Sequence, residues 1–226
     1  MPRSESIPTL PDIDVRLEPG RDGIHILLNQ KLVAIGGTVL DAALATIKAL
    51  DDAVVHRLKK FRAVHAGAVL VEGSALLVPG STHAGKSSLV AELLRRGALC
   101  FSDEYALIDN QGRVHAYPRP LLLRKGRPKQ SPCLPEELNS KYAAGHAPVG
   151  WIFAIDYASG GEWGVNGISQ SEAVTLLLRN TPHEMAEEPE MVDIFIRASA
   201  SATCYAGTRG DASEAVTRIF HLIGHK

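Results

Sequence analysis

The sequence of 226 residues has few cysteines, no excess of either charge and no long apolar run. Its three cysteines lie far apart, form no CxxC pair and have no metal-binding spacing, so we interpret them as reduced, structural thiols. Lysine and arginine total 24 against 25 acidic residues, which argues against a nucleic-acid partner. No apolar run approaches the ~20 residues that span a bilayer, so no membrane partner is expected.

The first residues also lack a targeting signal. The opening MPRSESIPTLPDID has no apolar centre of the kind that a signal peptide carries, which predicts a cytoplasmic protein. Residues 1–11 hold three prolines and few apolar side chains, and this composition predicts a flexible tail.

Two segments of different character follow the tail. Residues 12–60 begin with short stretches of alternating apolar residues, typical of strands, and continue with apolar residues at helical spacing over about 39–59. Thr38 followed by Asp41 is a helix N-cap signal. We expect this part to be appended to a core domain that spans 61–226.

The core segment alternates predicted strands with predicted helices, which favours an α/β protein. Residues 118–148 are rich in proline and basic residues and are predicted to form a long excursion. Three helices are expected to close the chain, beginning near Ser169, Pro189 and Asp211. The predicted strands span 64–71, 75–78, 98–101, 105–108, 114–117 and 151–155.

One motif stands between a predicted strand and a predicted helix. The segment GSTHAGKS, from Gly80 to Ser87, fits the pattern G-x-x-x-x-G-K-[ST] without a mismatch. Glycines allow the backbone to curl so that N–H groups point at phosphate oxygens, and the helix adds the positive end of its dipole. The predicted nucleotide-binding residues are Gly80, Ser81, Thr82, His83, Ala84, Gly85, Lys86, Ser87 and Ser88.

The last residues of the motif have separate chemical roles. Lys86 is a mobile charge that can reach the β- and γ-phosphates, and the Ser87 hydroxyl is a hard ligand for magnesium. The loop is therefore predicted to hold the triphosphate of ATP or GTP together with Mg²⁺. His83 can stack beside the nucleotide or face solvent, and the second alternative is favoured.

Asp103 and Glu104 supply a second signal, because they come directly after the predicted strand 98–101. We expect this strand to neighbour the strand before the loop, so that both carboxylates reach the phosphates. One can hold Mg²⁺ while the other accepts a proton from an attacking hydroxyl. The sequence has no N-K-x-D or T-K-x-D and no L-S-G-G-Q, which argues against a GTPase switch and an ABC-type ATPase.

The stretch VHAGAVLVEGSALLVPGSTHAGKSSLVAELLRRGALCFSDEYALI, Val64 to Ile108, resembles the catalytic domain of HPr kinase/phosphorylase. Shorter HPr-kinase-related proteins are more similar, since they carry SDE and a segment like GRVHAYPRPLLLR, Gly112 to Arg124. The resemblance is dense over 64–124 and thin beyond it. The matching residues are His65, Gly67, Gly80, Gly85, Lys86, Ser87, Arg96, Gly97, Asp103 and Glu104.

The resemblance implies a P-loop fold like that of HPr kinase and phosphoenolpyruvate carboxykinase, with a mixed β-sheet and flanking helices. It implies transfer of the γ-phosphoryl of ATP to a hydroxyl, with a serine of a protein or peptide as acceptor, and leaves a homo-oligomer open. By position, Asp103, Lys86 and His65 would be catalytic, with Asp103 as general base. Ser87, Glu104 and Asp103 would hold the metal.

Two other functions stay open at this point. One is a small-molecule kinase, and the other is a nucleotide-binding regulatory module without transfer chemistry. Glu104, where the HPr enzyme has aspartate, keeps the second of these open. The basic cluster Arg124–Lys129 can meet an anionic substrate or face water, and for it and for Arg209 the solvated interpretation is favoured.

Overall fold

The computed structural model of the chain describes residues 13–55, 57–124, 130–186 and 189–224. It divides the chain into two compact units, residues 1–57 and residues 58–226. The predicted tail of residues 1–11 lies outside the described part.

The smaller unit is a three-stranded antiparallel sheet followed by one helix. Thr38 Oγ1 accepts a hydrogen bond from the Asp41 N–H at 3.1 Å, so the helix begins at the predicted N-cap. It ends before the predicted residue 59, because the Arg57 N–H turns back to the Val54 carbonyl at 2.9 Å. The elements are β1 (Val15–Gly20), β2 (Gly23–Leu28), β3 (Lys31–Gly36) and α1 (Val39–Val55).

The larger unit is built on a mixed sheet of eight strands, which confirms the predicted α/β class. The strands are β4 (Phe61–Val71), β5 (Ser74–Pro79), β6 (Leu99–Ser102), β7 (Tyr105–Asp109), β8 (Arg113–His115), β11 (His146–Tyr157), β12 (Gly164–Gly167) and β13 (Thr203–Arg209). Their order is β12-β13-β11-β5-β4-β7-β8, with β6 paired to β4. Strand β5 is antiparallel to β4 but parallel to β11, and β11 is parallel to β13.

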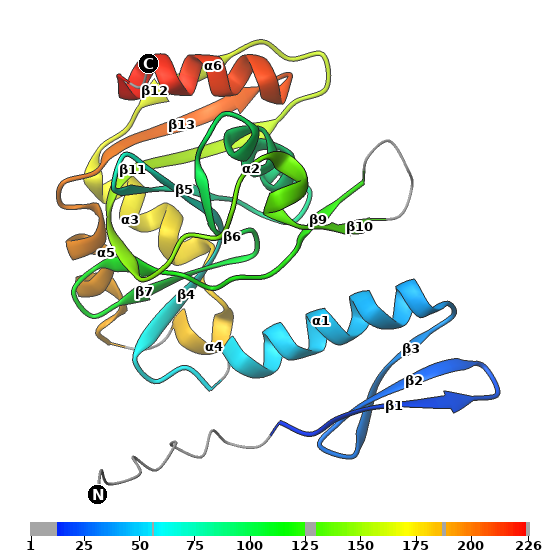
Figure 1. Cartoon of the computed structure of the whole chain (residues 1–226). Coiled ribbons are helices and arrows are strands. Elements are labelled where there is room, and N and C mark those ends of the chain that lie inside the picture. The colour runs from blue at the N-terminus through cyan, green and yellow to red at the C-terminus, as the bar shows by residue number, and fades with distance from the viewer. Residues whose placement is uncertain (1–12, 56, 125–129, 187–188, 225–226) are drawn as a thin grey trace, which may run out of the picture. The chain divides into compact units, whose positions relative to one another are not determined.

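Helices flank this sheet on both faces (Figure 1). On one face α2 (Lys86–Arg95) packs beside α6 (Ala212–Ile223), and Leu93 and Ile219 share a core cluster with Val69 and Phe153 of the sheet. Ile152 points to the opposite face, because successive side chains of a strand alternate. That face carries α3 (Gln170–Arg179) and α5 (Met191–Ser199), which contact each other, and the short α4 (His183–Ala186) precedes α5.

The predicted pairing of the strand before the acidic pair is wrong. Strand β6 was expected beside β5, but it pairs with β4 through Leu70, Val69 and Ala68. The hairpin with β4 occupies one edge of β5 and the parallel β11 occupies the other. No edge of β5 is left for β6, which therefore takes the free side of the long strand β4.

The predicted excursion over 118–148 contains regular structure. It holds the antiparallel pair β9 (Leu121–Leu123) and β10 (Ser131–Cys133), then a 3₁₀ helix, Pro135–Leu138. Leu121 and Cys133 are fully buried in the cluster that includes α2, so this hairpin is anchored beside the motif helix. Strands of three residues are too short to show a period in the sequence, which is why the pattern predicted none.

The three cysteines are free and buried, in agreement with their interpretation as structural thiols. Burial raises the pKa of Cys100 to about 12, so its thiol stays protonated at neutral pH. Among the described residues, no helix combines the length and the apolar character that crossing a membrane requires.

Gly67 of β4 provides a test of how the sheet holds the motif helix. A Cβ at this position would clash with Cγ2 of Val90 on α2, and Val90 is fully buried. Inserting a methyl group into such a contact costs about 1–3 kcal/mol. We expect Gly67→Ala to lower the free energy of unfolding by that amount in urea denaturation, and Val90→Ala in the same chain to recover part of the loss.

Gly164→Ala is the matched control for this prediction. A Cβ at Gly164 would meet its nearest atom, Thr208 Oγ1, at an ordinary 3.4 Å. Its effect should stay within about 0.5 kcal/mol. Equal losses in Gly67→Ala and Gly164→Ala would show that helix packing does not decide the result.

Candidate functional site

The loop between β5 and α2 carries the sequence motif, and two of its residues have positive φ. Gly85, the N-cap of α2, has φ 81°, and His83 has φ 73°, which is uncommon for a residue with a side chain. Gly80 does not have a positive φ, but it leaves room for its neighbours, because a Cβ there would lie 3.2 Å from Ala84 Cβ and 3.7 Å from Lys86 Cδ. The loop therefore curls closely around the stem of Lys86.

Gly85 is also fixed from outside the loop. Its carbonyl accepts a hydrogen bond from Nη2 of Arg209 at 2.8 Å, and the Arg209 Nη1 donates to the Gly210 carbonyl at 2.8 Å. A Cβ on Gly85 would lie 2.7 Å from that Nη2 and 2.9 Å from Tyr157 Cβ. The Tyr157 N–H in turn donates to the Ala84 carbonyl at 3.0 Å. Arg209 is only 2 % exposed, so its interpretation as a solvated residue is wrong.

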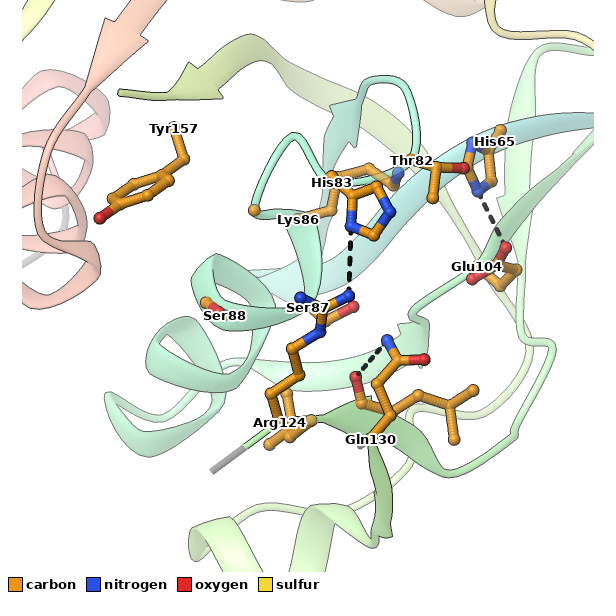
Figure 2. Close-up of a pocket in the computed structure, with 13 residues that line it drawn as sticks. His65, Thr82, His83, Lys86, Ser87, Ser88, Glu104, Arg124, Gln130 and Tyr157 are labelled. Carbon is orange, nitrogen blue, oxygen red and sulfur yellow. Dashed lines mark hydrogen bonds and ion pairs between the residues drawn. The ribbon is translucent and has the colours of Figure 1, made fainter. Parts of the chain in front are cut away.

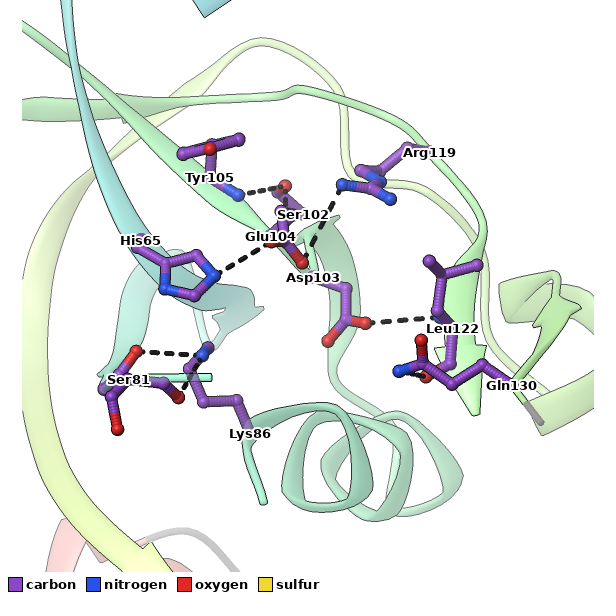
Figure 3. Close-up of polar contacts among 11 residues, drawn as sticks. His65, Ser81, Lys86, Ser102, Asp103, Glu104, Tyr105, Arg119, Leu122 and Gln130 are labelled. Carbon is purple, nitrogen blue, oxygen red and sulfur yellow. Dashed lines mark hydrogen bonds and ion pairs between the residues drawn. The ribbon is translucent and has the colours of Figure 1, made fainter. Parts of the chain in front are cut away.

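Lys86 is the first residue of α2 and is buried. Its Nζ donates to the carbonyls of Gly80 and Ser81, both at 2.8 Å (Figure 3). Burial lowers the pKa of Lys86, while the nearby carboxylates of Asp103 and Glu104 oppose that shift. The ammonium group is thus held inside the curled loop, in the position from which it can reach an anion bound there.

Asp103 lies behind the first turn of α2 and is 2 % exposed. The Leu122 N–H donates to its Oδ2 at 3.4 Å, and the Ser87 hydroxyl lies beside the carboxyl group and favours its charged form. Burial outweighs these contacts and raises the pKa of Asp103 to about 7. Within the described part of the chain, its Oδ1 is buried and accepts no hydrogen bond of good geometry.

Glu104 points to different partners from those of Asp103 (Figure 3). Its Oε1 lies 2.9 Å from Nε2 of His65, and its Oε2 lies 3.9 Å from Nη1 of Arg119. Burial by itself would raise the pKa of Glu104, but the hydrogen bond and charge of His65, with Arg119 and Lys86, lower it below its usual range. The Glu104 carboxylate is therefore charged and paired with His65.

His65 is held in place by its backbone on β4. Its N–H donates to the Asn180 carbonyl at 2.7 Å, and its carbonyl accepts from the Gly80 N–H at 3.4 Å. The second of these bonds joins His65 to the first residue of the motif loop. The hairpin of β4 and β5, in which Ala66 pairs with Pro79, thereby brings the histidine and the loop together.

A cavity of about 340 Å³ lies over the loop (Figure 2). Of the predicted catalytic and metal-binding residues, His65, Glu104, Lys86 and Ser87 line it, and Asp103 does not. Gly80, Ser81 and Ala84 shape the loop without lining the cavity. The predicted nucleotide-binding residues that line it are Thr82, His83, Gly85, Lys86, Ser87 and Ser88.

The donor groups of the site suit a magnesium ion bound together with phosphate. Among the described residues, no group of three or more His, Cys, Asp or Glu side chains could hold a metal by itself. The Ser87 hydroxyl and the buried Asp103 carboxyl group lie beside each other and offer hard oxygen atoms that could bind such an ion. Mg²⁺ characteristically takes one or two protein ligands and completes its shell with water and substrate phosphates.

The basic cluster over 124–129 is described at its first residue only, and 125–129 lie outside the described residues. Nη2 of Arg124 lies 3.4 Å from Nδ1 of His83, and both side chains are exposed and line the cavity (Figure 2). His83 thus lies at the edge of the cavity, exposed to solvent and within reach of a ligand in the cavity.

Three residues of the site were not identified from the sequence. Arg119, 7 % exposed, approaches Glu104, and Tyr157 and Arg209 hold Gly85. Tyr157 has a signal in the sequence, because it follows the predicted strand 151–155 by two residues, at the edge of the sheet where ligands bind. From the sequence, Arg209 is interpreted as solvated, and Arg119 belongs to the segment Gly112–Arg124 without a role of its own.

Comparisons with known proteins give a distant structural similarity and no similarity in sequence. No protein-family model matches the sequence, and no curated protein matches it. Among solved structures, the HPr(Ser) kinase/phosphatase from Coxiella burnetii is similar at 18% identity and a TM-score of 0.34. The similarity covers 42% of this chain and 65% of that chain, less than two thirds of its length. A likeness this weak leaves the functional hypothesis to the residues of the site.

The raised pKa of Asp103 predicts a stability effect in the metal-free protein. The folded chain holds the Asp103 proton more tightly than the unfolded chain, so a penalty develops between pH 3.8 and about 7. Its full size is on the order of a few kcal/mol. We expect Asp103→Asn to raise the melting temperature in EDTA at pH 8 and to change it little at pH 4, measured by differential scanning calorimetry.

Asp156→Asn, at an exposed position near the end of β11, is the control for this measurement. It should show no gain that grows with pH. If Asp103→Asn changes the melting temperature equally at pH 4 and pH 8, the pKa of Asp103 is the same in the folded and unfolded chain and the burial penalty is absent. A loss that is larger at pH 8 than at pH 4 would mean that the partners of the carboxylate stabilise its charged form.

Proposed function

We propose that the protein is an ATP-dependent phosphotransferase of the HPr-kinase-related type, which moves the γ-phosphoryl group of ATP to a hydroxyl. The acceptor we propose is a serine of a protein or peptide. One observation carries the proposal: the same cavity is lined by Lys86 and Ser87 of the loop and by the His65–Glu104 pair. A phosphate site and a proton-accepting group thus share one space, as transfer to a hydroxyl requires.

Binding of the triphosphate is supported by the loop and by α2. Backbone N–H groups at the start of a helix of ten residues, with the positive end of its dipole, suit phosphate oxygens. Lys86 would exchange its bonds to the Gly80 and Ser81 carbonyls for bonds to the β- and γ-phosphates. Mg²⁺, when bound through Ser87, would neutralise charge on the transferring group.

The roles of the two carboxylates follow from their surroundings. The sequence favoured Asp103 as the base and Glu104 at the metal. The opposite division is better supported, because Asp103 is almost fully buried beside Ser87 while Glu104 lines the cavity. In this proposal Asp103 holds the metal side of the site and Glu104, positioned by His65, faces the acceptor.

The transfer step can then be written in terms of these residues. The acceptor oxygen forms a bond to the γ-phosphorus as the bond to the bridging oxygen of ADP breaks. The hydroxyl proton passes to the carboxylate of Glu104, and His65 keeps that carboxylate oriented. Lys86 remains charged throughout and stabilises the negative charge on the phosphoryl oxygens.

A nucleotide-binding module without transfer chemistry is the second candidate. It is favoured by one observation, since the contacts of Glu104 with His65 and Arg119 lower its pKa and make it a weaker base. Incubation with γ-labelled ATP and lysate separates the candidates. A labelled protein band supports the first proposal, a labelled metabolite indicates a small-molecule kinase, and ATP binding without transfer indicates a module.

ATP affinity should depend on Lys86. Lys86→Ala removes a charge-assisted contact with the phosphates, and we expect a loss of about 1.5–3 kcal/mol in binding free energy by isothermal titration calorimetry. Lys141→Ala, at an exposed position outside the cavity, is the control and should bind ATP normally. Wild-type affinity in a folded Lys86→Ala protein would remove the phosphate-loop interpretation.

Asp103→Asn and Glu104→Gln should fail in different ways. Glu104→Gln keeps its shape but cannot accept a proton, so transfer should fall by about 10²–10⁴-fold while ATP binding changes little. Asp103→Asn should weaken magnesium-dependent ATP binding, and higher Mg²⁺ should restore it by mass action. Calorimetry over a magnesium series and a transfer assay measure the two effects.

If the two variants behave the other way round, Asp103 is the base and Glu104 holds the metal, as the sequence predicts. In that case Asp103→Asn would bind Mg-ATP normally and lose transfer, and the defect of Glu104→Gln would be relieved by magnesium. If neither variant changes transfer, both carboxylates lie outside the chemistry.

A further inference from the structure

A second cavity, of about 510 Å³, adjoins the one over the loop. It lies where the ends of β11 and β13 meet the start of α6, and it shares Gly85, Ser88 and Tyr157 with the first cavity. Because the two cavities share these lining residues, a ligand bound in the first cavity can extend directly into the second. Its volume is in the range of cavities that bind small ligands.

The motif fixes which end of a bound triphosphate lies at which end of the cavity. Lys86 and Ser87 serve the β- and γ-phosphates, and the His65–Glu104 pair marks the end of the cavity where the γ-phosphate would meet its acceptor. Figure 2 shows Tyr157 at the opposite end, beyond Ser88. The group attached to the α-phosphate would therefore leave the loop past Ser88 and enter the second cavity.

The walls of the second cavity suit a flat, uncharged group. Gly160, Gly161 and Gly210 line it without side chains, and the ring of Tyr157 is half exposed there. Asp211, the N-cap of α6, places a negative charge at the cavity and disfavours another phosphate. An aromatic ring system can stack on a tyrosine face in such a slot.

Arg209 adds a hydrogen-bond donor to this cavity. Its guanidinium lies over the Tyr157 ring, 5.6 Å from the ring centroid, and its two Nη atoms are bonded to the Gly85 and Gly210 carbonyls. Within the described residues, its buried Nε has no hydrogen-bond partner. A buried donor without a partner is costly, and a ligand with nitrogen or oxygen acceptors would satisfy it.

We propose that the second cavity is the nucleoside subsite of the enzyme, in which the base of the nucleotide stacks on Tyr157 beside Arg209. The inference rests on the proposed function, since it requires the triphosphate on the loop. It assigns the recognition of the nucleoside to β11, β13 and α6, and leaves recognition of the triphosphate to the motif.

Tripolyphosphate and ATP separate the two parts of the site. Ala212 is the first residue of α6 and lines the second cavity, so Ala212→Leu would fill the space without touching the loop. We expect Mg-ATP to bind this variant at least about tenfold more weakly in calorimetry, while Mg-tripolyphosphate binds within about twofold of wild type. Ala200→Leu, the same substitution at an exposed site after α5, should leave both affinities unchanged.

Tyr157→Ala gives a second measurement that does not depend on filling the cavity. It should weaken ATP by roughly tenfold and tripolyphosphate little, and Tyr157→Phe should bind ATP normally because the ring face remains. Unchanged ATP affinity in both Ala212→Leu and Tyr157→Ala would overturn the subsite, as would equal losses for ATP and tripolyphosphate. Wild-type protein that binds neither compound would overturn the proposed function itself, and the subsite with it.

Discussion

The hydrogen bond from the buried Arg209 to the Gly85 carbonyl is the contact on which the geometry of the site depends. It joins the end of β13 to the residue that turns the motif loop into α2, and it leaves no room for a side chain at Gly85. The second half of the loop is therefore fixed to the sheet through Arg209 and Tyr157. The first half of the loop contains the exposed residues Thr82 and His83, which line the cavity. The loop is therefore anchored to the sheet at its second half and accessible at its first half.

The two neighbouring acidic residues Asp103 and Glu104 differ in pKa because burial affects them differently. Asp103 and Glu104 are adjacent in the turn between β6 and β7, but Asp103 is buried beside Ser87 while Glu104 meets His65 at the cavity. Burial raises the pKa of Asp103, while His65 and Arg119 outweigh burial at Glu104. Two neighbouring carboxylates thus acquire different chemistry from their environments alone.

The sequence was informative where a pattern is local. The G-x-x-x-x-G-K-S motif, the Thr38 cap and the α2 helix each depend on residues close together in the chain, and the structure forms each of the helices predicted from them. Pairings between distant segments were harder to predict. The position of β6 depended on which strands occupy both edges of β5, and β13 was missed because glycine and alanine hide its alternation.

Candidate site residues showed the same contrast. His65 and the acidic pair had a local signal, whereas Arg209 and Arg119 are identified only once the fold buries them. Burying an arginine is unfavourable unless its donors find partners. One of the two carbonyls that accept from Arg209 belongs to Gly85, which is 124 residues away in the sequence. Such a contact exists only in the complete fold. The support of the loop is therefore a property of the tertiary structure, and a change at β13 can alter the shape of the loop without touching the motif.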